Sequence, residues 1–535
     1  MMKKLIFSMI IFLFVISIPF AGEAAEQMYV MPLGTNWEIQ GDLPTYAMLI
    51  SLQGVANQKA PRLYFFYPDD WDFKFSEPLM KYYQDSRNMQ FQELKTAEEA
   101  LEKLAKYADG YIIWDKSVRT SLIVSFTAAG LYNSIVVSEE LIPLAEKFGL
   151  HEKIDFRSKF TGKSDYKIYK WAYKEYWDLC SKDYLVYMGG HSGKVMKPGV
   201  ADFGIYKKAF FTDASTNPSD TLEYQFAKRI FREMKPMSLV MGWHSYGKDT
   251  EAQHVKLASS YALRVEGLHT LPNMSFNHQI SVTPGYKFKN NHNIEPGEKY
   301  VPEKKVYIAS IQTDCLGLGA WTEPGRGDIP YAWEVTMNWS WLAPAMLQFF
   351  YDMATPNDYF IGSLSGPGYM YPKAIPAEYL PDVVEKAYQL MKTLDLNVFE
   401  TMDHTNYWQS EGVDDDLTEE VVDAYYKGMP DAIGFANGYR PGHTFTVKNG
   451  KPFISFDYYL SEKRDEDEAA SDLMELANLN SNRPYFLLMH VREYSDINRV
   501  KRILKKLGPE FELVPLDIFM KLAGNKPTFQ TKFAK

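Results

Sequence analysis

The sequence predicts an α/β protein in which small N-terminal α/β domains precede a C-terminal β/α barrel. Strand-like and helix-like segments alternate along the chain, which is typical of parallel α/β layers. The 535 residues also exceed what a single hydrophobic core accommodates. We therefore expect a first domain over 26–140, a second α/β domain over 141–233 and a TIM-like, irregular barrel over 234–535.

The N-terminal half supplies the first strands and helices of this pattern. Apolar or aromatic runs at 62–67, 110–114 and 134–137 predict strands, and the segments 47–55 and 97–107 have helical spacing. In the second unit, predicted helices at 166–179 and 222–234 flank a predicted strand at 184–188. These elements predict parallel sheets covered by helices.

From about residue 235 the alternation becomes regular, which indicates a β/α barrel without fixing its number of strands. The predicted strands are 238–243, 270–276, 305–313, 359–364, 397–401, 432–436, 453–456 and 485–490. Helices fit between many of them, for example at 344–353, 377–394, 467–476 and 496–506.

The N-terminus has the pattern of a secretory signal peptide over 1–24. Lys3 and Lys4 precede an apolar run that ends near Ala21, and small residues follow at the expected cleavage point. An uncleaved membrane anchor is the alternative. No later stretch is long and apolar enough to span a bilayer, so we expect a secreted or periplasmic protein without membrane contact after cleavage.

The charge and the cysteine content limit the classes of partner and of fold that the chain fits. The net charge is −10 and basic runs are missing, which argues against a nucleic-acid partner. Cys180 and Cys315 are the only cysteines, so a disulfide framework is not expected. Aromatic residues make up 15% of the chain, and some of them are available to stack on sugar rings.

The segment 366–372, which reads Gly-Pro-Gly-Tyr-Met-Tyr-Pro, follows a predicted strand. Its glycines permit a sharp bend, and its prolines stiffen the loop. Tyr369 and Tyr371 would present flat rings with a hydroxyl at the tip, which suits a saccharide ligand. The alternative is a structural turn with two packed tyrosines.

This heptad fits the pattern Gly-x-Gly-Tyr-x-Tyr-Pro, and the chain resembles the GxGYxYP family. Ser-Leu-Gln-Gly at 51–54, Asn-Met-Ser at 273–275 and Asn-Asp-Tyr-Phe at 357–360 agree with it. The resemblance thus extends over nearly the whole mature chain. It implies two or three small α/β domains, a C-terminal β/α barrel and a glycoside hydrolase activity on an unidentified carbohydrate.

A β/α barrel carries its chemistry at the C-terminal ends of its strands, and a glycosidase needs two carboxyl groups there. We therefore predict Asp314, Glu400 and Asp403 as catalytic residues. The alternatives are a cap for Asp314, a buried ion pair for Glu400 and a turn-shaping role for Asp403. Asp314 also matches a family position. The family's Asp-Gly-Asp-Asn is replaced here by Asp-Cys-Leu-Gly at 314–317. The resemblance then implies either that activity depends on Glu400 or Asp403 or that it is lost.

Aromatic and histidine side chains near these positions are the predicted substrate contacts. They are Trp243, His244, Trp321, Tyr369, Tyr371, Trp408 and His490. We predict no cofactor and no metal, because no two histidines lie three or four residues apart. Two alternatives remain open: a non-catalytic carbohydrate-binding protein, and a metal-dependent polysaccharide deacetylase with ligands such as His244, Asp314 and His490.

Overall fold

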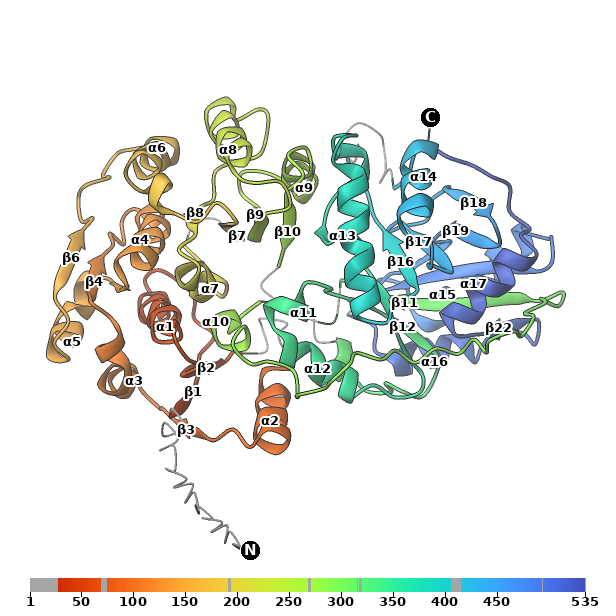
Figure 1. The fold of residues 1–535 in the computed structure, drawn as a ribbon, viewed down its shortest axis with the longest axis horizontal. Coiled ribbons are helices and arrows are strands. Elements are labelled where there is room, and N and C mark those ends of the chain that lie inside the picture. Colours follow the sequence, from red (N-terminus) through yellow and green to blue (C-terminus); the bar gives the residue numbers. More distant parts are fainter. Residues whose placement is uncertain are drawn as a thin grey trace, which may run out of the picture.

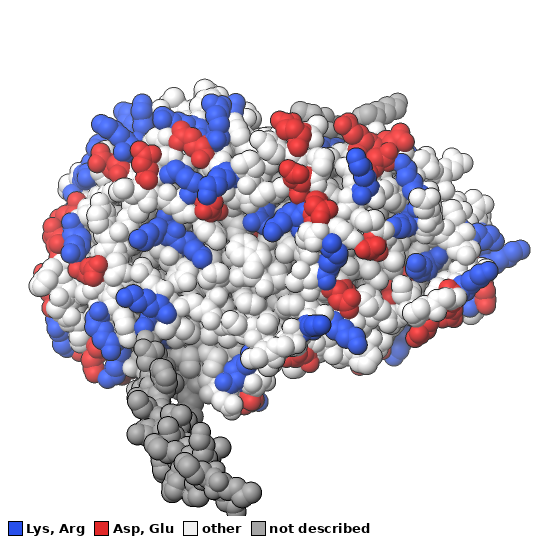
Figure 2. Space-filling view, in the orientation of Figure 1, with Lys and Arg blue, Asp and Glu red and all other residues white. Residues whose placement is uncertain are grey.

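A computed structural model of the chain describes residues 27–68, 75–190, 194–267, 271–314, 316, 320–405, 415–492 and 494–534. Figure 1 shows the elements up to β10 in one half of the molecule and the sheet that starts at β11 in the other half, with α11 and α12 between them. Lys, Arg, Asp and Glu are interspersed on the face seen in Figure 2. No helix of the described residues is long and apolar enough to cross a membrane.

Two small parallel sheets begin the chain. The first has the order β2-β1-β3 and the second the order β5-β4-β6. Their strands are β1 (Met28–Pro32), β2 (Leu63–Phe66), β3 (Phe91–Glu93), β4 (Gly110–Ile113), β5 (Ser134–Val137) and β6 (Glu152–Asp155). Their helices are α1 (Leu43–Ala56), α2 (Ser76–Arg87), α3 (Ala97–Leu104), α4 (Arg119–Tyr132), α5 (Ile142–Lys147) and α6 (Asp165–Tyr176). The range 26–140 therefore contains all of the first sheet and two strands of the second. The third strand of the second sheet, β6, lies after residue 140.

The third sheet has the parallel strand order β10-β9-β7-β8. Its strands are β7 (Tyr184–Gly190), β8 (Phe210–Thr212), β9 (Leu239–Ser245) and β10 (Arg264–Glu266), and its helices are α7 (Ala201–Tyr206), α8 (Thr221–Glu233) and α9 (Glu251–Ser259). A hairpin from much later in the chain, β14 (Ser365–Gly366) and β15 (Gly368–Tyr369), adds to its edge, with β15 antiparallel to β10.

Two of the segments predicted as barrel strands do not belong to the curled sheet. The predicted strand 238–243 is β9, which pairs with β7 and β10 in the third sheet. Alternation along the chain does not reveal which sheet a strand joins, and this assignment was therefore wrong. The described part of the predicted strand 270–276 is not a strand, and its last three residues begin the short helix α10 (Met274–Asn277).

The C-terminal half forms a 10-stranded sheet. Its parallel order is β19-β17-β16-β13-β12-β11-β21-β20, with β18 antiparallel to β19 and β22 beside β11. The strands are β11 (Val306–Gln312), β12 (Tyr331–Val335), β13 (Asp358–Gly362), β16 (Val398–Thr401), β17 (Gly434–Asn437), β18 (Phe445–Lys448), β19 (Lys451–Ser455), β20 (Tyr458–Leu460), β21 (Tyr485–Val491) and β22 (Phe511–Leu513). The helices are α11 (Trp339–Leu342), α12 (Pro344–Asp352), α13 (Leu380–Thr393), α14 (Glu419–Gly428), α15 (Glu466–Leu479), α16 (Ile497–Leu504) and α17 (Leu516–Asn525).

This sheet is strongly curled. Only Phe456 and Asp457 separate β19 from β20, although the two strands lie at opposite ends of the strand order. The Phe456 N–H donates to the Asn437 carbonyl of β17, and the Asp457 N–H donates to the Leu488 carbonyl of β21. Residues 451–460 thus bridge the two ends of the sheet. The predicted α/β class is confirmed, with a curled parallel sheet in the C-terminal half.

The concave face of the curled sheet carries an apolar layer near the start of its strands. Ala332 and Val398 belong to this layer, and α17 packs against it through Phe519 and Met520. Because side chains alternate in a strand, Glu334 and Glu400 follow two residues later on the same face. Both glutamates are buried, beside the apolar Ile361 and Ala436, with which they pair in the neighbouring strands.

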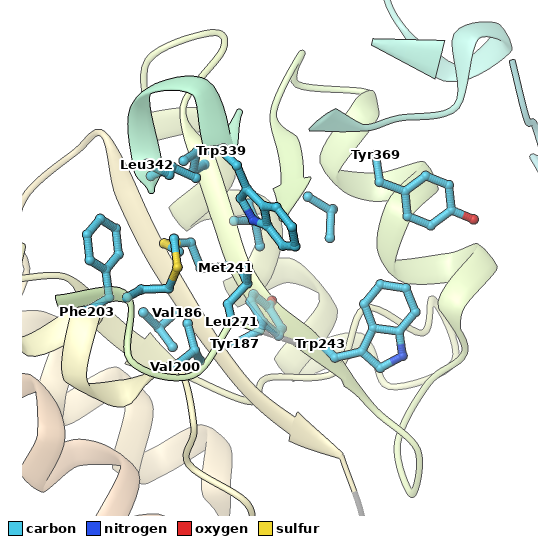
Figure 3. Close-up of a cluster of buried hydrophobic side chains, with 14 of the residues drawn as sticks. Val186, Tyr187, Val200, Phe203, Met241, Trp243, Leu271, Trp339, Leu342 and Tyr369 are labelled. Atoms are coloured by element: carbon cyan, nitrogen blue, oxygen red, sulfur yellow. The ribbon is translucent and has the colours of Figure 1, made fainter. Parts of the chain in front are cut away.

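A buried cluster joins the third sheet to the C-terminal half. Figure 3 shows Trp339 and Leu342 of α11 packed over side chains of the sheet such as Met241. Trp243 and Tyr369 lie side by side at the edge of this cluster.

Candidate active site

A cavity of about 570 Å³ lies between the third sheet and the curled sheet. The C-terminal strand ends of the curled sheet line one wall, through Asp314 after β11, Thr336 and Met337 after β12, Ser363 and Leu364 after β13, Met402 and His404 after β16, Tyr439 and Arg440 after β17, and Arg492 after β21. Parallel strands place these residues at one edge of the sheet. The cavity therefore occupies the edge where the sequence predicted chemistry.

The opposite wall comes from the third sheet. Trp243 at the end of β9 stacks on Tyr369, with ring centres 6.2 Å apart and planes 12° apart. The Tyr369 hydroxyl donates a hydrogen bond of 2.6 Å to Glu251 Oε1 at the start of α9. Thr250 caps that helix in a capping box, which fixes its first turn. Tyr246 also lines the cavity and is 51% exposed, so this wall offers both packed and open aromatic rings.

The heptad forms the joint between the two walls. Its residue Tyr369 pairs with Val265 of β10, and the Pro367 carbonyl accepts a hydrogen bond of 2.9 Å from Arg264 Nη1. Gly368 has φ 144°, where a side chain is strained. A Cβ there would lie 2.9 Å from Arg264 Cβ and 3.1 Å from Glu266 Oε1. Only glycine therefore lets the hairpin approach β10 this closely.

Glu266 at the end of β10 is a buried carboxyl group that lines the cavity and is 4% exposed. Asn338 Nδ2 donates a hydrogen bond to its Oε1. Arg264 Nη1 and Trp341 Nε1 each donate to Asn338 Oδ1 at 2.9 Å, which fixes the orientation of that amide. Burial raises the pKa of Glu266 to about 7, against the opposing effects of Asn338 and Arg264. Near neutral pH this side chain can hold or release a proton.

Asp314 follows β11 and faces Glu266's wall across the cavity. Its carboxylate Oδ2 lies 2.5 Å from Arg492 Nε, and an arginine at that distance favours the ionised carboxylate. The backbone of Asp314 has φ 65°, which is uncommon for a residue other than glycine. The predicted strand-end placement of Asp314 therefore brings a charged carboxylate to the cavity.

The other two predicted catalytic residues do not line the cavity. Glu400 is 1% exposed. Met402, two residues after Glu400, lines the cavity, and so does Thr336, two residues after Glu334. The Glu334–Glu400 pair therefore lies one layer beneath the cavity floor. Burial raises the pKa of Glu400 well above its usual value, and the neighbouring Glu334 adds to this effect.

Asp403 holds a turn. Its carboxylate accepts hydrogen bonds from the backbone N–H of Lys373 at 2.7 Å and of Thr405 at 2.8 Å. Its oxygen atoms are directed to the backbone, which corresponds to the turn-shaping alternative of the sequence analysis.

His404 lines the cavity beside a buried aspartate. Its Nε2 lies 2.9 Å from Asp415 Oδ1. Burial disfavours the charged imidazolium, but the Asp415 carboxylate outweighs it and raises the pKa of His404 above the usual value. The second oxygen of Asp415 accepts the backbone N–H groups of Tyr439 and Arg440 at 2.9 and 3.1 Å. One carboxylate thus positions both a histidine and the turn after β17.

Of the predicted substrate contacts, Trp243, His244 and Tyr369 line the cavity. Trp321 packs in the core, with ring centres 5.0 Å from Trp333 and 5.7 Å from Phe360. Tyr371 is fully buried behind Tyr369, and Trp408 lies outside the described residues.

His490 is buried, and both of its ring nitrogens are engaged, by the Thr313 hydroxyl and the Tyr439 carbonyl. The candidate metal ligands His244, Asp314 and His490 do not form a metal site. Across the described ranges, no group of three or more His, Cys, Asp or Glu is placed to hold a metal ion.

Family models match the chain in four consecutive segments. They are "GxGYxYP_N 1st domain" over 28–106, "GxGYxYP_N second domain" over 108–180, "GxGYxYP third domain" over 182–279 and "GxGYxYP putative glycoside hydrolase C-terminal domain" over 304–524. The chain belongs to the GxGYxYP family. Each of the first three segments contains the parallel strands of one of the small sheets, and the fourth contains the curled sheet. In this GxGYxYP chain the heptad belongs to the fourth segment but pairs with a strand of the third.

A solved structure has the same fold. A crystal structure described as a putative hydrolase from Bacteroides thetaiotaomicron aligns with a TM-score of 0.73 and 18% sequence identity, over 94% of this chain and 95% of that chain. A search of curated proteins finds no match.

Several cavity residues of this GxGYxYP protein escaped the sequence analysis. Glu266 ends a strand of the third sheet and Glu251 begins helix α9 beside it, and the strand ends of this sheet were not considered as a site. Arg440 and Arg492 follow predicted strands, so the strand-end rule could have found them if cations had been included with the carboxylates.

Proposed function

We propose that this protein is an exported glycoside hydrolase that cleaves a carbohydrate in the cavity between the third and the curled sheet. The curled sheet would act as an irregular β/α barrel with its site at the C-terminal strand ends. One observation carries the proposal. Two carboxyl groups at the same cavity have environments that favour opposite protonation states, as glycosidases require.

In the proposed reaction, Glu266 donates its proton to the glycosidic oxygen as the bond to the anomeric carbon breaks. Asp314, ionised beside Arg492, either attacks the anomeric carbon or takes a proton from the attacking water. If Asp314 attacks, the ionised Glu266 takes a proton from the water that then hydrolyses the ester between Asp314 and the sugar, which frees Asp314 and reprotonates Glu266. If Asp314 takes the proton of the attacking water instead, it releases that proton to solvent and Glu266 regains one from solvent. Trp243, Tyr246 and Tyr369 offer apolar ring faces to the sugar.

Two substitutions test the proposal. We expect Glu266→Gln and Asp314→Asn each to lower the release of reducing ends from a responsive oligosaccharide by roughly 10²–10⁴-fold, because each removes one proton-transfer or nucleophilic group. Isothermal titration should show that Glu266→Gln still binds the sugar. The exposed Glu303, outside the cavity, supplies a control in Glu303→Gln.

Two other outcomes would change the assignment. Full turnover in both variants would rule out this carboxyl pair. Binding without product release by the unmodified protein would favour the carbohydrate-binding alternative. Export is a separate part of the proposal. It follows from the signal peptide predicted over 1–24, and N-terminal sequencing that finds a mature protein beginning near Ala25 checks it.

A further inference from the structure

The turn after β17 is held in place by buried groups. Gly438 has φ 99°, and a Cβ there would lie 3.1 Å from the Arg440 carbonyl and 3.3 Å from Asp415 Cβ. Asp415, which is 2% exposed, accepts the N–H groups of both Tyr439 and Arg440. His490 donates from Nδ1 to the Tyr439 carbonyl. These contacts fix the backbone that carries the Arg440 side chain to the cavity.

Among the described residues at this edge of the cavity, one cation has no carboxylate beside it. Arg492 pairs with Asp314, and His404 pairs with Asp415. Arg440 is exposed and forms no ion pair with a carboxylate of the residues that the structure describes. The other cavity carboxylates are engaged on the opposite wall, where Glu251 accepts from Tyr369 and Asp249 accepts from the backbone N–H of Ser245.

We propose that the saccharide bound in this cavity carries an anionic group, either a uronic acid carboxylate or a sulfate ester, and that Arg440 binds it. This inference rests on the proposed function, because it takes the ligand to be a saccharide. The planar guanidinium forms two parallel hydrogen bonds to a carboxylate or a sulfate. The aromatic wall across the cavity then receives the face of the sugar ring.

Binding of matched oligosaccharides tests the charge requirement. Titrations use Glu266→Gln protein, to prevent turnover, and one backbone of fixed length in neutral, uronate and sulfated forms. We expect an anionic form to bind at least about tenfold more tightly than the neutral form, since a charge-assisted contact is gained. Salt should weaken this preference, because Arg440 is exposed. The uronate and sulfate titrations distinguish the two anionic groups.

Arg440 variants test the assigned residue. Arg440→Gln should remove the tenfold preference and leave neutral binding unchanged, while Arg440→Lys, which keeps the charge, should restore part of it. Arg464, which pairs with Asp472 and does not line the cavity, supplies the control Arg464→Gln. Melting temperatures show whether the variants fold alike.

Each outcome decides between the proposals. Equal binding of neutral and anionic forms, or an unchanged preference in Arg440→Gln, overturns the assignment of an anionic substrate. If neutral sugars are also bound and hydrolysed, the glycoside hydrolase proposal stands while this inference falls. If no saccharide of the set binds, both fall.

Discussion

At the scale of single residues, the proton affinity of Glu266 is set by burial and by neighbours from its own strand and from the segment around α11. Burial in β10 raises its pKa, whereas the amide of Asn338 and the charge of Arg264 act in the opposite direction. Asn338 is itself held by Arg264 and Trp341. A general acid needs a pKa close to the working pH, and this balance provides one.

The balance predicts a shift in pH dependence. Turnover should fall as pH rises above about 7, where Glu266 loses its proton. In Asn338→Leu the hydrogen bond that stabilises the ionised form is lost, so the pKa of Glu266 rises and the basic limb of the pH–rate profile moves to higher pH. Carbon-13 NMR titration of the Glu266 carboxyl measures the same shift without any substrate.

Ser340→Ala, in the short helix α11 that directly follows Asn338, supplies the control for this experiment. Its hydroxyl bonds to the Met337 carbonyl and not to Glu266. A basic limb that stays in place in Asn338→Leu would contradict the assignment of Glu266 as the proton donor.

At the scale of elements, the heptad hairpin connects two sheets that lie far apart in the sequence. β14 and β15 leave the curled sheet after β13 and add to the edge of β10. The same hairpin brings Tyr369 to Trp243 and places Gly368 against Glu266. The signature of the family is thus both a structural joint and part of the cavity wall.

Substitution of the two heptad glycines should show which of them the packing of the hairpin against β10 requires. Gly368→Ala places a Cβ against Arg264 and Glu266 at φ 144°, so we expect a loss of about 1–3 kcal/mol in unfolding free energy and a large loss of turnover. Gly366→Ala meets the flexible end of Met370, at 2.9 Å from Sδ, and should cost less. Urea unfolding and turnover measure both; equal effects at the two positions would contradict this interpretation.

Local sequence patterns predicted some features of the elements and the site and could not predict others. The strand–helix alternation and the strand-end position of Asp314 depend on residues adjacent in the chain, and they were predicted. The sheet of β9 depends on its pairing with β7, which periodicity does not encode. The importance of Glu266 depends on Asn338, 72 residues later in the chain, so no local pattern indicated it.

At the scale of the whole molecule, an ionic network ties the second sheet's helices to the third sheet. Lys248 Nζ lies 2.7 Å from Asp165, 3.0 Å from Asp213 and 3.1 Å from Glu223. Arg119 at the start of α4 pairs with Asp213 at 2.5 Å. These contacts join segments that belong to separate sheets, and Asp213 is fully buried.

Removal of this lysine should destabilise the molecule. Lys248→Met removes the cation beside Glu223 and Asp165 and leaves Arg119 as the partner of Asp213, and we expect a loss of about 3 kcal/mol in unfolding free energy. Lys305→Met breaks partly exposed pairs with Glu512 and Glu303 and should cost less than about 1 kcal/mol. Urea unfolding compares the two variants. Similar small losses would show that the network contributes little to the docking of the two sheets.

The two walls of the cavity come from different segments of the gene, and this limits how recombination can alter the site. The segment that carries the glycoside hydrolase description, 304–524, supplies Asp314 and Arg492 but lacks Trp243, Glu251 and Glu266. A gene that acquired this segment alone by recombination would inherit half of a cavity. New specificities are therefore expected to arise in this family by substitution within an intact four-segment gene, because exchange of single segments would separate the two walls.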